Sequence, residues 1–276
     1  MRQLALAKKL LWLTVGSIFI TVFVLSSVLW WQLSNSNQQL AAQSEKLIVA
    51  EVEDKLASNA AAYGEQVAGF INEAYRVPYS FAAILGDHDA AGTLTRDAVV
   101  ELNRSLLQKN TILSSIYSQF EANAFDGRDA NFISGYDHSV AGVGTLEIYF
   151  TRNRDGAIEQ QVVDDAAEKY VDTLNEFGQR EAEWYLCVKD TKVPCIMEPY
   201  LYEITPGYSE MMTSLTVPIL RDNEFIGVAG VDLTLPVFQS MTEKLSKELY
   251  NGKARVTLLS SLDLVVGSSH YKDKLG

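Results

Sequence analysis

The chain has 276 residues, of which 47% are hydrophobic and 21% charged, and its formal net charge is −12. The acidic balance argues against nucleic acid and anionic lipid as partners, because both are negatively charged. No G-x-S-x-G elbow, H-E-x-x-H helix or glycine-rich phosphate loop occurs in the sequence, so we expect neither an enzyme nor a bound cofactor. The length suits one large domain or two modules.

An uncharged apolar run, LLWLTVGSIFITVFVLSSVLWW, occupies residues 10–31. At about 1.5 Å per residue, a helix of this length spans a hydrocarbon core of about 30 Å. Basic residues are present at Arg2, Lys8 and Lys9 and none follows until Lys46, which predicts a cytoplasmic segment at residues 1–9. The run is too long for a signal peptide core and lacks an A-x-A site. We therefore expect a retained anchor in the inner membrane, with the remaining chain in the periplasm.

Residues 32–76 carry apolar residues at helical spacing and strong helix formers, and no proline occurs before Pro78. They predict one long stalk helix, which would pack along the ectodomain or pair with its copy in a homodimer. Three shorter helices are predicted further along the chain. The first starts at an N-cap, Thr95, and runs to residue 109, the second covers residues 162–177, and the third covers residues 236–250.

Segments rich in β-branched and aromatic residues, separated by turns such as RDG, PGY and RDNE, predict strands. They are residues 112–120, 145–153, 183–189, 195–204, 211–220 and 224–233. The order of elements predicts an α+β fold with one curved antiparallel sheet, since short turns join the last strands. Residues 254–269 look like the opening hairpin of another sheet, and we expect the sequence to be a fragment of a longer protein.

The two cysteines, Cys187 and Cys195, flank the short segment VKDTKVP. In an oxidising compartment this spacing predicts a disulfide that closes a hairpin. A metal site would need more ligands, and the nearest histidine, His138, is distant in sequence, so no metal site is expected.

Several segments, in this order, resemble the ligand-binding region of double Cache (dCache) chemoreceptors, the bacterial methyl-accepting chemotaxis proteins. They are EANAFDGRDANF, YFTRNRDGAI, EWYLC with EPYLYE, MTSLTVPI and GVAGVDLTL. The resemblance implies a PAS-like, membrane-distal Cache module over residues 77–235. It also implies a connecting helix and the start of a membrane-proximal module over residues 236–276. A second membrane helix and an output domain with cytoplasmic signalling partners would lie beyond Gly276.

The resemblance also implies where the ligand binds. In amino-acid-binding members a Tyr, an Arg and a Trp-Tyr pair precede a second Tyr and an Asp. Four positions match here, and the place of the Arg is taken by Ala182 and the place of the first Tyr by Phe177. The matching residues are Trp184, Tyr185, Tyr200 and Asp232, and Tyr149 lies in another matched segment.

Without a guanidinium, a ligand carboxylate would have no bidentate partner. The remaining aromatic and acidic residues favour a small amine or polyamine, with Asp232 as its anchor and Glu210 on a neighbouring strand as a second acid. Glu210 could equally be a solvated turn residue. Trp184 and Tyr185 would lie on opposite faces of a regular strand, which would leave one of them in the core.

Arg180 could replace the missing Arg, in which case the protein would be an amino-acid sensor. The segment could also be the sensor part of a histidine kinase or of a cyclic-dinucleotide enzyme, or have a structural role. In each sensor reading, the ligand is expected to signal across the membrane by a small displacement of the long helix.

Overall fold

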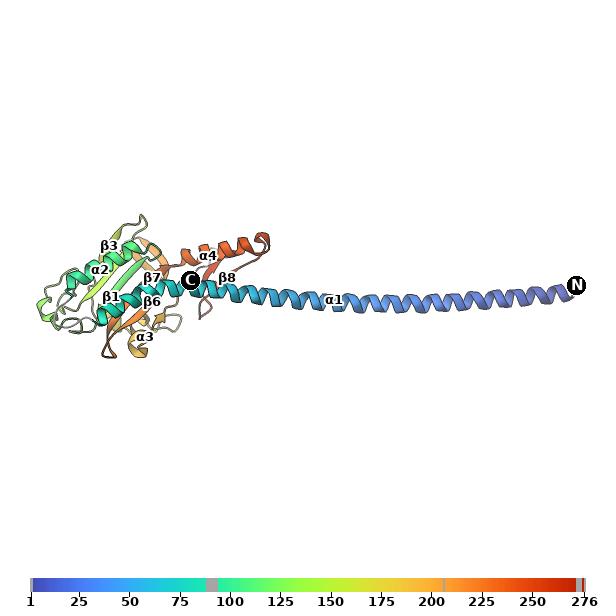
Figure 1. Ribbon diagram of the computed structural model, residues 1–276, viewed down its shortest axis with the longest axis horizontal. Helices are drawn as coiled ribbons and strands as arrows, with labels where there is room; N and C mark the ends of the chain where they lie inside the picture. Colours follow the sequence, from blue (N-terminus) through green and yellow to red (C-terminus); the bar gives the residue numbers. More distant parts are fainter. Residues whose placement is uncertain (1, 88–93, 206, 272–274, 276) are drawn as a thin grey trace. The chain divides into compact units, whose positions relative to one another are not determined.

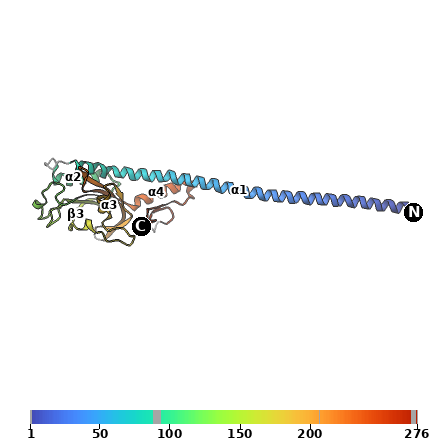
Figure 2. The same cartoon turned by 90° about the horizontal axis from the view of Figure 1, so that it is seen from below.

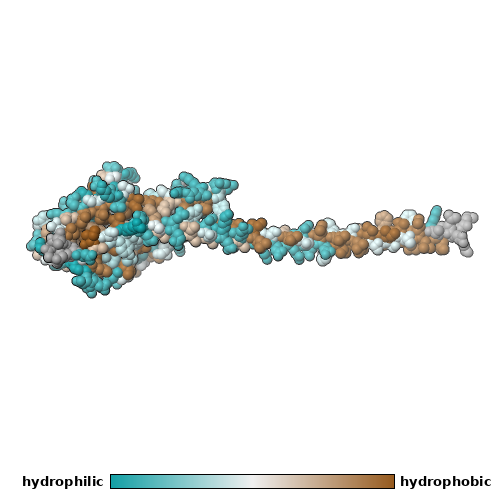
Figure 3. Space-filling model, viewed as in Figure 1, coloured by the Kyte–Doolittle hydropathy of each residue, from teal (hydrophilic) through white to brown (hydrophobic). Residues whose placement is uncertain are grey.

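We describe a computed structural model of the chain that covers residues 2–87, 94–205, 207–271 and 275. By its internal contacts the chain divides into two compact units, residues 1–65 and 66–276. The first unit is helical and belongs to α1 (Arg2–Gly86). Among the described residues, α1 is the one helix that is long and apolar enough to cross a membrane. Figure 3 shows apolar residues over its N-terminal part, and large side chains such as Phe19 and Trp30 are exposed there.

The second unit is built on an antiparallel sheet with the strand order β3-β2-β1-β7-β6-β4, in which β5 also pairs with β6. The strands are β1 (Ser115–Phe120), β2 (Glu147–Arg152), β3 (Ile158–Gln161), β4 (Cys195–Ile196), β5 (Tyr200–Thr205), β6 (Tyr208–Arg221) and β7 (Glu224–Thr234). The α+β fold with a curved antiparallel sheet is thus confirmed, although the sequence did not predict β3.

The two faces of the sheet have different coverings, because successive residues in a strand point to opposite sides. On one face Ile116, Leu215 and Val231 join the main hydrophobic core with the end of α1 and with α2 (Arg96–Lys109). On the other face Tyr117 and Val228 pack with α3 (Glu183–Thr191). Figures 1 and 2 show α2 and α3 at the sheet of the second unit.

The sequence predicted that the long helix ends near Arg76. In the structure α1 continues through Pro78 to Gly86. A proline within a helix removes one backbone hydrogen bond and costs about 3 kcal/mol. Beyond Pro78, Phe81 and Leu85 are fully buried in the main core, and this burial offsets the cost. The prediction for α2 is confirmed, including its N-cap, since the Thr95 side chain accepts a hydrogen bond from the Ala98 amide at 3.2 Å.

Two other predicted elements are wrong. Residues 162–177 contain a short 3-10 turn, η2 (Glu168–Tyr170), in place of a helix. The Asp165 side chain accepts from the amide of Ala167, and a turn of this kind competes with helix formation. Residues 183–189, predicted as a strand, form the helix α3.

After the sheet the chain forms α4 (Leu235–Glu248), a 3-10 turn η3 (Leu249–Gly252) and the hairpin of β8 (Thr257–Leu259) and β9 (Val265–Ser268). The predicted helix and hairpin are therefore confirmed. The assignment of residues 236–276 to a second module remains a prediction.

Candidate functional site

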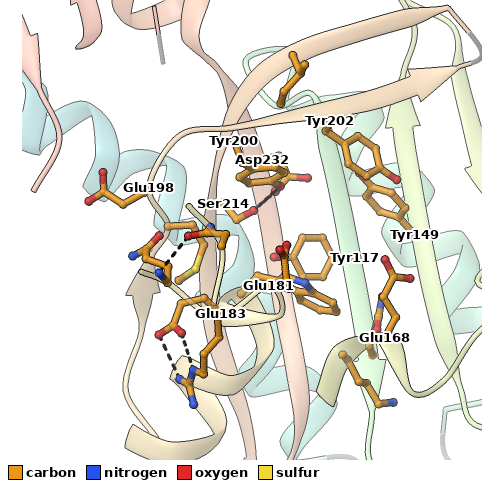
Figure 4. A pocket seen from close by; sticks show the side chains of 18 of the residues that line it. Tyr117, Tyr149, Glu168, Glu181, Glu183, Glu198, Tyr200, Tyr202, Ser214 and Asp232 are labelled. Atoms are coloured by element: carbon orange, nitrogen blue, oxygen red, sulfur yellow. Dashed lines mark hydrogen bonds and ion pairs between the residues drawn. The ribbon is translucent and has the colours of Figure 1, made fainter. Parts of the chain in front are cut away.

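A cavity of about 630 Å³ opens on the α3 face of the sheet, a size within the usual range for small-molecule sites. Its walls come from strands β1, β2, β5, β6 and β7, from the start of α3, and from the segments at residues 161–169, 175–181 and 197–199. Figure 4 shows Tyr200, Ser214 and Asp232 grouped together, with Tyr149 and Tyr202 to one side and Glu198 to the other.

Asp232 on β7 is the acidic centre of this cavity and is 1% exposed. It is opposite Ser115 on β1 and Ser214 on β6, so both hydroxyls reach its carboxylate. Ser214 donates to Oδ1 at 2.6 Å, Ser115 donates to Oδ2, and Tyr200 lies 3.5 Å from Oδ1. Burial raises the pKa of Asp232, and these hydrogen bonds oppose the shift. All three partners are neutral, so none of the described residues gives this carboxylate a countercharge within hydrogen-bond distance.

Four aromatic rings meet edge to face along the cavity, in the order Trp184, Tyr117, Tyr149 and Tyr202. The distances between successive ring centroids are 5.4, 6.0 and 5.8 Å. Tyr117 lies across Gly230 of the neighbouring strand, where an added Cβ would come within 2.4 Å of two ring carbons and the hydroxyl oxygen. Burial and the charge of Asp232 raise the pKa of Tyr117 well above its usual range, which keeps this hydroxyl neutral. Such rings attract cations through their faces.

The charge of the lining is predominantly negative. Among the described residues, eight lining side chains are carboxylates and two, Lys169 and Arg180, are basic. Lys169 is buried and bonds Glu147 at 2.5 Å, and Arg180 is held by Glu183 at 2.6 Å and by Asp190 at 2.6 Å. Both bases are therefore neutralised within the protein. Of the eight carboxylate residues, Asp232 and Glu198 are buried.

Glu198 lies in the short segment between β4 and β5 and is 7% exposed. One carboxylate oxygen, Oε1, accepts a hydrogen bond from Ser261, which belongs to the turn between β8 and β9. This contact connects the wall of the cavity to the hairpin that follows α4.

The structure brings five of the predicted site residues together. Tyr149, Phe177, Trp184, Tyr200 and Asp232 all line the cavity. Ala182, at the place of the family's Arg, is 1% exposed, so a long side chain there would have to displace core atoms. That these residues contact a ligand remains a prediction.

Two predicted residues lie outside the cavity lining. Tyr185 is fully buried beside Phe225, and its hydroxyl donates to Glu121 at 2.9 Å. Because residues 183–189 are helical, Trp184 and Tyr185 project about 100° apart rather than to opposite faces of a strand. Glu210 accepts a hydrogen bond from Tyr208 at the start of β6 and is not part of the lining.

Cys187 and Cys195 form the predicted disulfide, with a Cα–Cα distance of 6.3 Å. The bond joins α3 to β4, so the expectation that it closes a hairpin was wrong. It ties together two walls of the cavity, since Trp184 belongs to α3 and the Glu198 segment follows β4. Within the described residues, no group of three or more His, Cys, Asp or Glu is arranged to hold a metal ion.

Sequence reasoning missed Tyr117, Tyr202, Ser115, Ser214 and Glu198. Tyr202 could have been found, because it is two residues from Tyr200 in a strand and so shares its face. No local sequence pattern marks Tyr117 or the two serines as site residues. The pairing of β1 and β6 with β7 brings them to Asp232 and its neighbour Gly230.

The sequence and the fold match those of bacterial sensor domains. Residues 145–240 match the family model described as the first PDC sensor domain of methyl-accepting chemotaxis protein-like proteins. The methyl-accepting chemotaxis protein TlpQ of Pseudomonas aeruginosa is 30% identical over 194 residues, which are 70% of this chain and 26% of that protein. The chain thus spans about a quarter of the length of this relative.

Solved structures agree on the fold. The structure of a protein named methyl-accepting chemotaxis protein X is 23% identical, with a TM-score of 0.62. The match covers 83% of this chain and 77% of that one. The periplasmic sensory domain of the Campylobacter jejuni chemoreceptor Tlp1 has a TM-score of 0.54 at 15% identity, over 77% and 70% of the two chains. The extracellular domain of a protein described as a histidine kinase, mmHK1S-Z3, is 21% identical, with a TM-score of 0.56. The match covers 76% of this chain and 68% of that one.

Residues 145–240 therefore match a sensor domain of the PDC type, and the solved structures agree with its fold. More particularly, residues 145–240 resemble the first PDC sensor domain of methyl-accepting chemotaxis protein-like proteins, and a chemotaxis protein is 30% identical over 194 residues.

Proposed function

We propose that this chain is the sensor region of a transmembrane chemoreceptor and that its ligand is a small amine or polyamine. The observation that carries the proposal is Asp232, a buried carboxylate whose hydrogen-bond partners are all neutral hydroxyls. A buried charge without a countercharge is costly, and a ligand ammonium would supply the countercharge.

The aromatic rings support the same ligand class. Ring faces attract an ammonium group by about 0.5–2 kcal/mol, depending on desolvation, and a hydrogen bond to a charged group contributes about 1.5–3 kcal/mol. Trp184 and Tyr200 are half-buried. Both rings line the cavity together with Asp232, so a ligand in the cavity would contact the rings and the carboxylate at once.

The charges of the lining oppose a ligand whose recognition depends on a carboxylate. The predicted substitute for the missing Arg, Arg180, is engaged by two carboxylates, and these ion pairs raise its pKa further. Lys169 is committed to Glu147 and to the carbonyl oxygen of Phe120. An amino-acid ligand would therefore have to break an existing ion pair before its carboxylate found a partner.

The proposal also includes the membrane topology, the homodimer and the output domain. Residues 10–31 anchor the chain in the inner membrane and residues 32–276 lie in the periplasm. The chain pairs with its copy as a homodimer, and the ligand acts by displacing α1. The output domain, of a chemoreceptor or of a histidine kinase or cyclic-dinucleotide enzyme, lies beyond Gly276.

Calorimetry on the purified chain tests the ligand class. Putrescine, spermidine and simple monoamines are titrated beside the common amino acids, and the amines are expected to bind. Asp232→Asn should remove this binding, and the matched control Glu210→Gln, outside the cavity, should retain it. Binding of amino acids without binding of amines would show that the amine proposal is wrong and would direct attention to Arg180.

A further inference from the structure

The hydroxyl of Tyr117 differs from the other polar groups around Asp232. Tyr117 is 5% exposed and lines the cavity, and its oxygen is buried without a well-formed hydrogen bond in the described structure. Buried polar atoms are nearly always paired, so an unpaired one at a ligand cavity calls for an explanation.

The protons around Asp232 are already assigned. Ser115 and Ser214 each donate to the carboxylate, and Ser214 lies 2.8 Å from the Tyr200 hydroxyl. Because the single proton of Ser214 is directed at Asp232, the hydrogen bond between Ser214 and Tyr200 uses the tyrosine proton. Ser214 also acts on the Tyr117 hydroxyl, but its one proton is directed at Asp232, so the lone pairs of the Tyr117 oxygen remain without a donor among the described residues.

The position of Tyr117 is built into the sheet. Its ring occupies the space above Gly230, which any side chain at position 230 would fill. Trp184 and Tyr149 pack against the ring edge to face. The ring is thus held on three sides, and the charge of Asp232 acts on its hydroxyl. The Tyr117 oxygen and the Asp232 carboxylate therefore present two hydrogen-bond acceptors to one cation.

We propose that the Tyr117 hydroxyl accepts an N–H of the ligand and makes the site selective for primary ammonium groups over quaternary ones. The proposal rests on the proposed function and deepens it. Aromatic faces and a carboxylate alone would also hold a trimethylammonium group, which has no N–H. A primary ammonium can donate to Asp232 and to Tyr117 together, whereas a trimethylammonium group leaves Tyr117 unpaired.

The binding experiment uses two pairs of probes on the full chain, butylamine with butyltrimethylammonium and putrescine with its hexamethylated counterpart. Tyr117→Phe keeps the ring and removes the acceptor. We expect the affinity for the primary amines to fall about tenfold or more and the affinity for the quaternary ions to change less than twofold. An equal loss for both members of a pair, or no loss, would overturn the proposal.

Thermal unfolding of the ligand-free variants gives an independent readout. Tyr117→Phe removes an unpaired buried hydroxyl, so Tm should stay the same or rise. The matched control is Tyr185→Phe, which removes a buried hydroxyl that is bonded to Glu121 outside the cavity. This control should lower Tm by about 2–4 °C and leave the affinity for butylamine within twofold. If Tyr117→Phe lowers Tm as the control does, the hydroxyl has a structural role instead.

The two proposals fail in different ways. If the wild-type chain binds none of the four probes, the amine function is wrong and the role of Tyr117 is wrong with it. If it binds the primary amines and Tyr117→Phe binds them equally well, the amine function stands and only the role of Tyr117 is lost.

Discussion

Tyr75 on α1 donates a hydrogen bond to the carbonyl oxygen of Cys195 on β4, with an oxygen–oxygen distance of 2.6 Å. Cys195 is also bonded to Cys187 on α3, the helix that carries Trp184. A short chain of contacts thus connects the cavity to α1 within the second unit. A ligand that shifts α3 or β4 would displace the hydrogen-bond partner of the helix.

We expect Tyr75→Phe to weaken the coupling between ligand and helix. The free energy of unfolding should fall by about 1 kcal/mol, the usual net contribution of one hydrogen bond. The affinity for putrescine should change little, because Tyr75 does not line the cavity. Disulfide crosslinking between single cysteines introduced along residues 34–76 measures the helix response. If crosslinking of the single-cysteine variants that retain Tyr75 does not respond to saturating putrescine, the coupling is contradicted.

Asp232 should make amine binding depend on pH. Burial raises its folded-state pKa above the ordinary value of about 3.9, so the carboxylate takes up a proton as the pH falls through this raised value. Putrescine should then bind more weakly at the acidic end. Calorimetry over a pH series measures this effect. Asp232→Asn should bind at least about thirtyfold more weakly at neutral pH, a cost of about 2–5 kcal/mol, and show no such dependence.

The same group affects the stability of the ligand-free protein with the opposite sign. Because the folded-state pKa is raised, the folded chain binds more protons than the unfolded chain between the two pKa values. The contribution of Asp232 to the free energy of unfolding therefore falls as pH rises through this window. Urea denaturation of the wild type and of Asp232→Asn across the window would show a smaller decline in the variant. Identical pH profiles would argue against the raised pKa.

Replacing both cysteines by serine should destabilise the domain by about 2–3 kcal/mol, the value expected for a loop as short as the one that joins Cys187 and Cys195. Because the disulfide joins two cavity walls, affinity for putrescine should fall as well. Denaturation and calorimetry on the double variant measure the two effects. Two freely alkylatable thiols in natively purified wild-type protein would contradict the disulfide itself.

Lys169→Met tests the buried ion pair at the edge of the cavity. Lys169 and Glu147 are each 1% exposed, and burial raises the pKa of Glu147 while the lysine lowers it. Removing the lysine leaves a buried carboxylate unpaired, which costs about 3–5 kcal/mol. Arg76→Met is the control, since the pair of Arg76 and Glu73 is exposed and should contribute less than about 1 kcal/mol. Equal losses in the two variants would show that the buried pair has no special role.

The sequence predicted most of the fold because its signals are local. The strand segments, the Thr95 N-cap and the apolar run of residues 10–31 each depend on neighbours along the chain. The helix predicted over residues 162–177 fails for a local reason, the Asp165 turn, whereas the other failures depend on tertiary packing. Pro78 stays inside α1 because Phe81 and Leu85 pack in the core, and residues 183–189 form a helix although aromatic residues there favour a strand.

The candidate site was predictable where family resemblance supplied the positions, as for Trp184, Tyr200 and Asp232. It was not predictable where strand pairing decides. Ser115, Tyr117 and Ser214 lie beside Asp232 or its neighbour Gly230 only because β1 and β6 flank β7 in this register. Glu210 was misplaced for the same reason, since its position near the start of β6, opposite Tyr202, sets it outside the cavity lining.

The hydrogen bond from Ser261 to Glu198 has a consequence for building receptor chimaeras. A junction placed at the end of the sheet, near residue 235, would exchange the hairpin that contains Ser261 and so alter the cavity wall along with the output. By reciprocity, any coupling through this contact changes ligand affinity as much as ligand changes the hairpin. A fusion that retains residues up to Ser268, the end of β9, would transfer the specificity of the sensor intact.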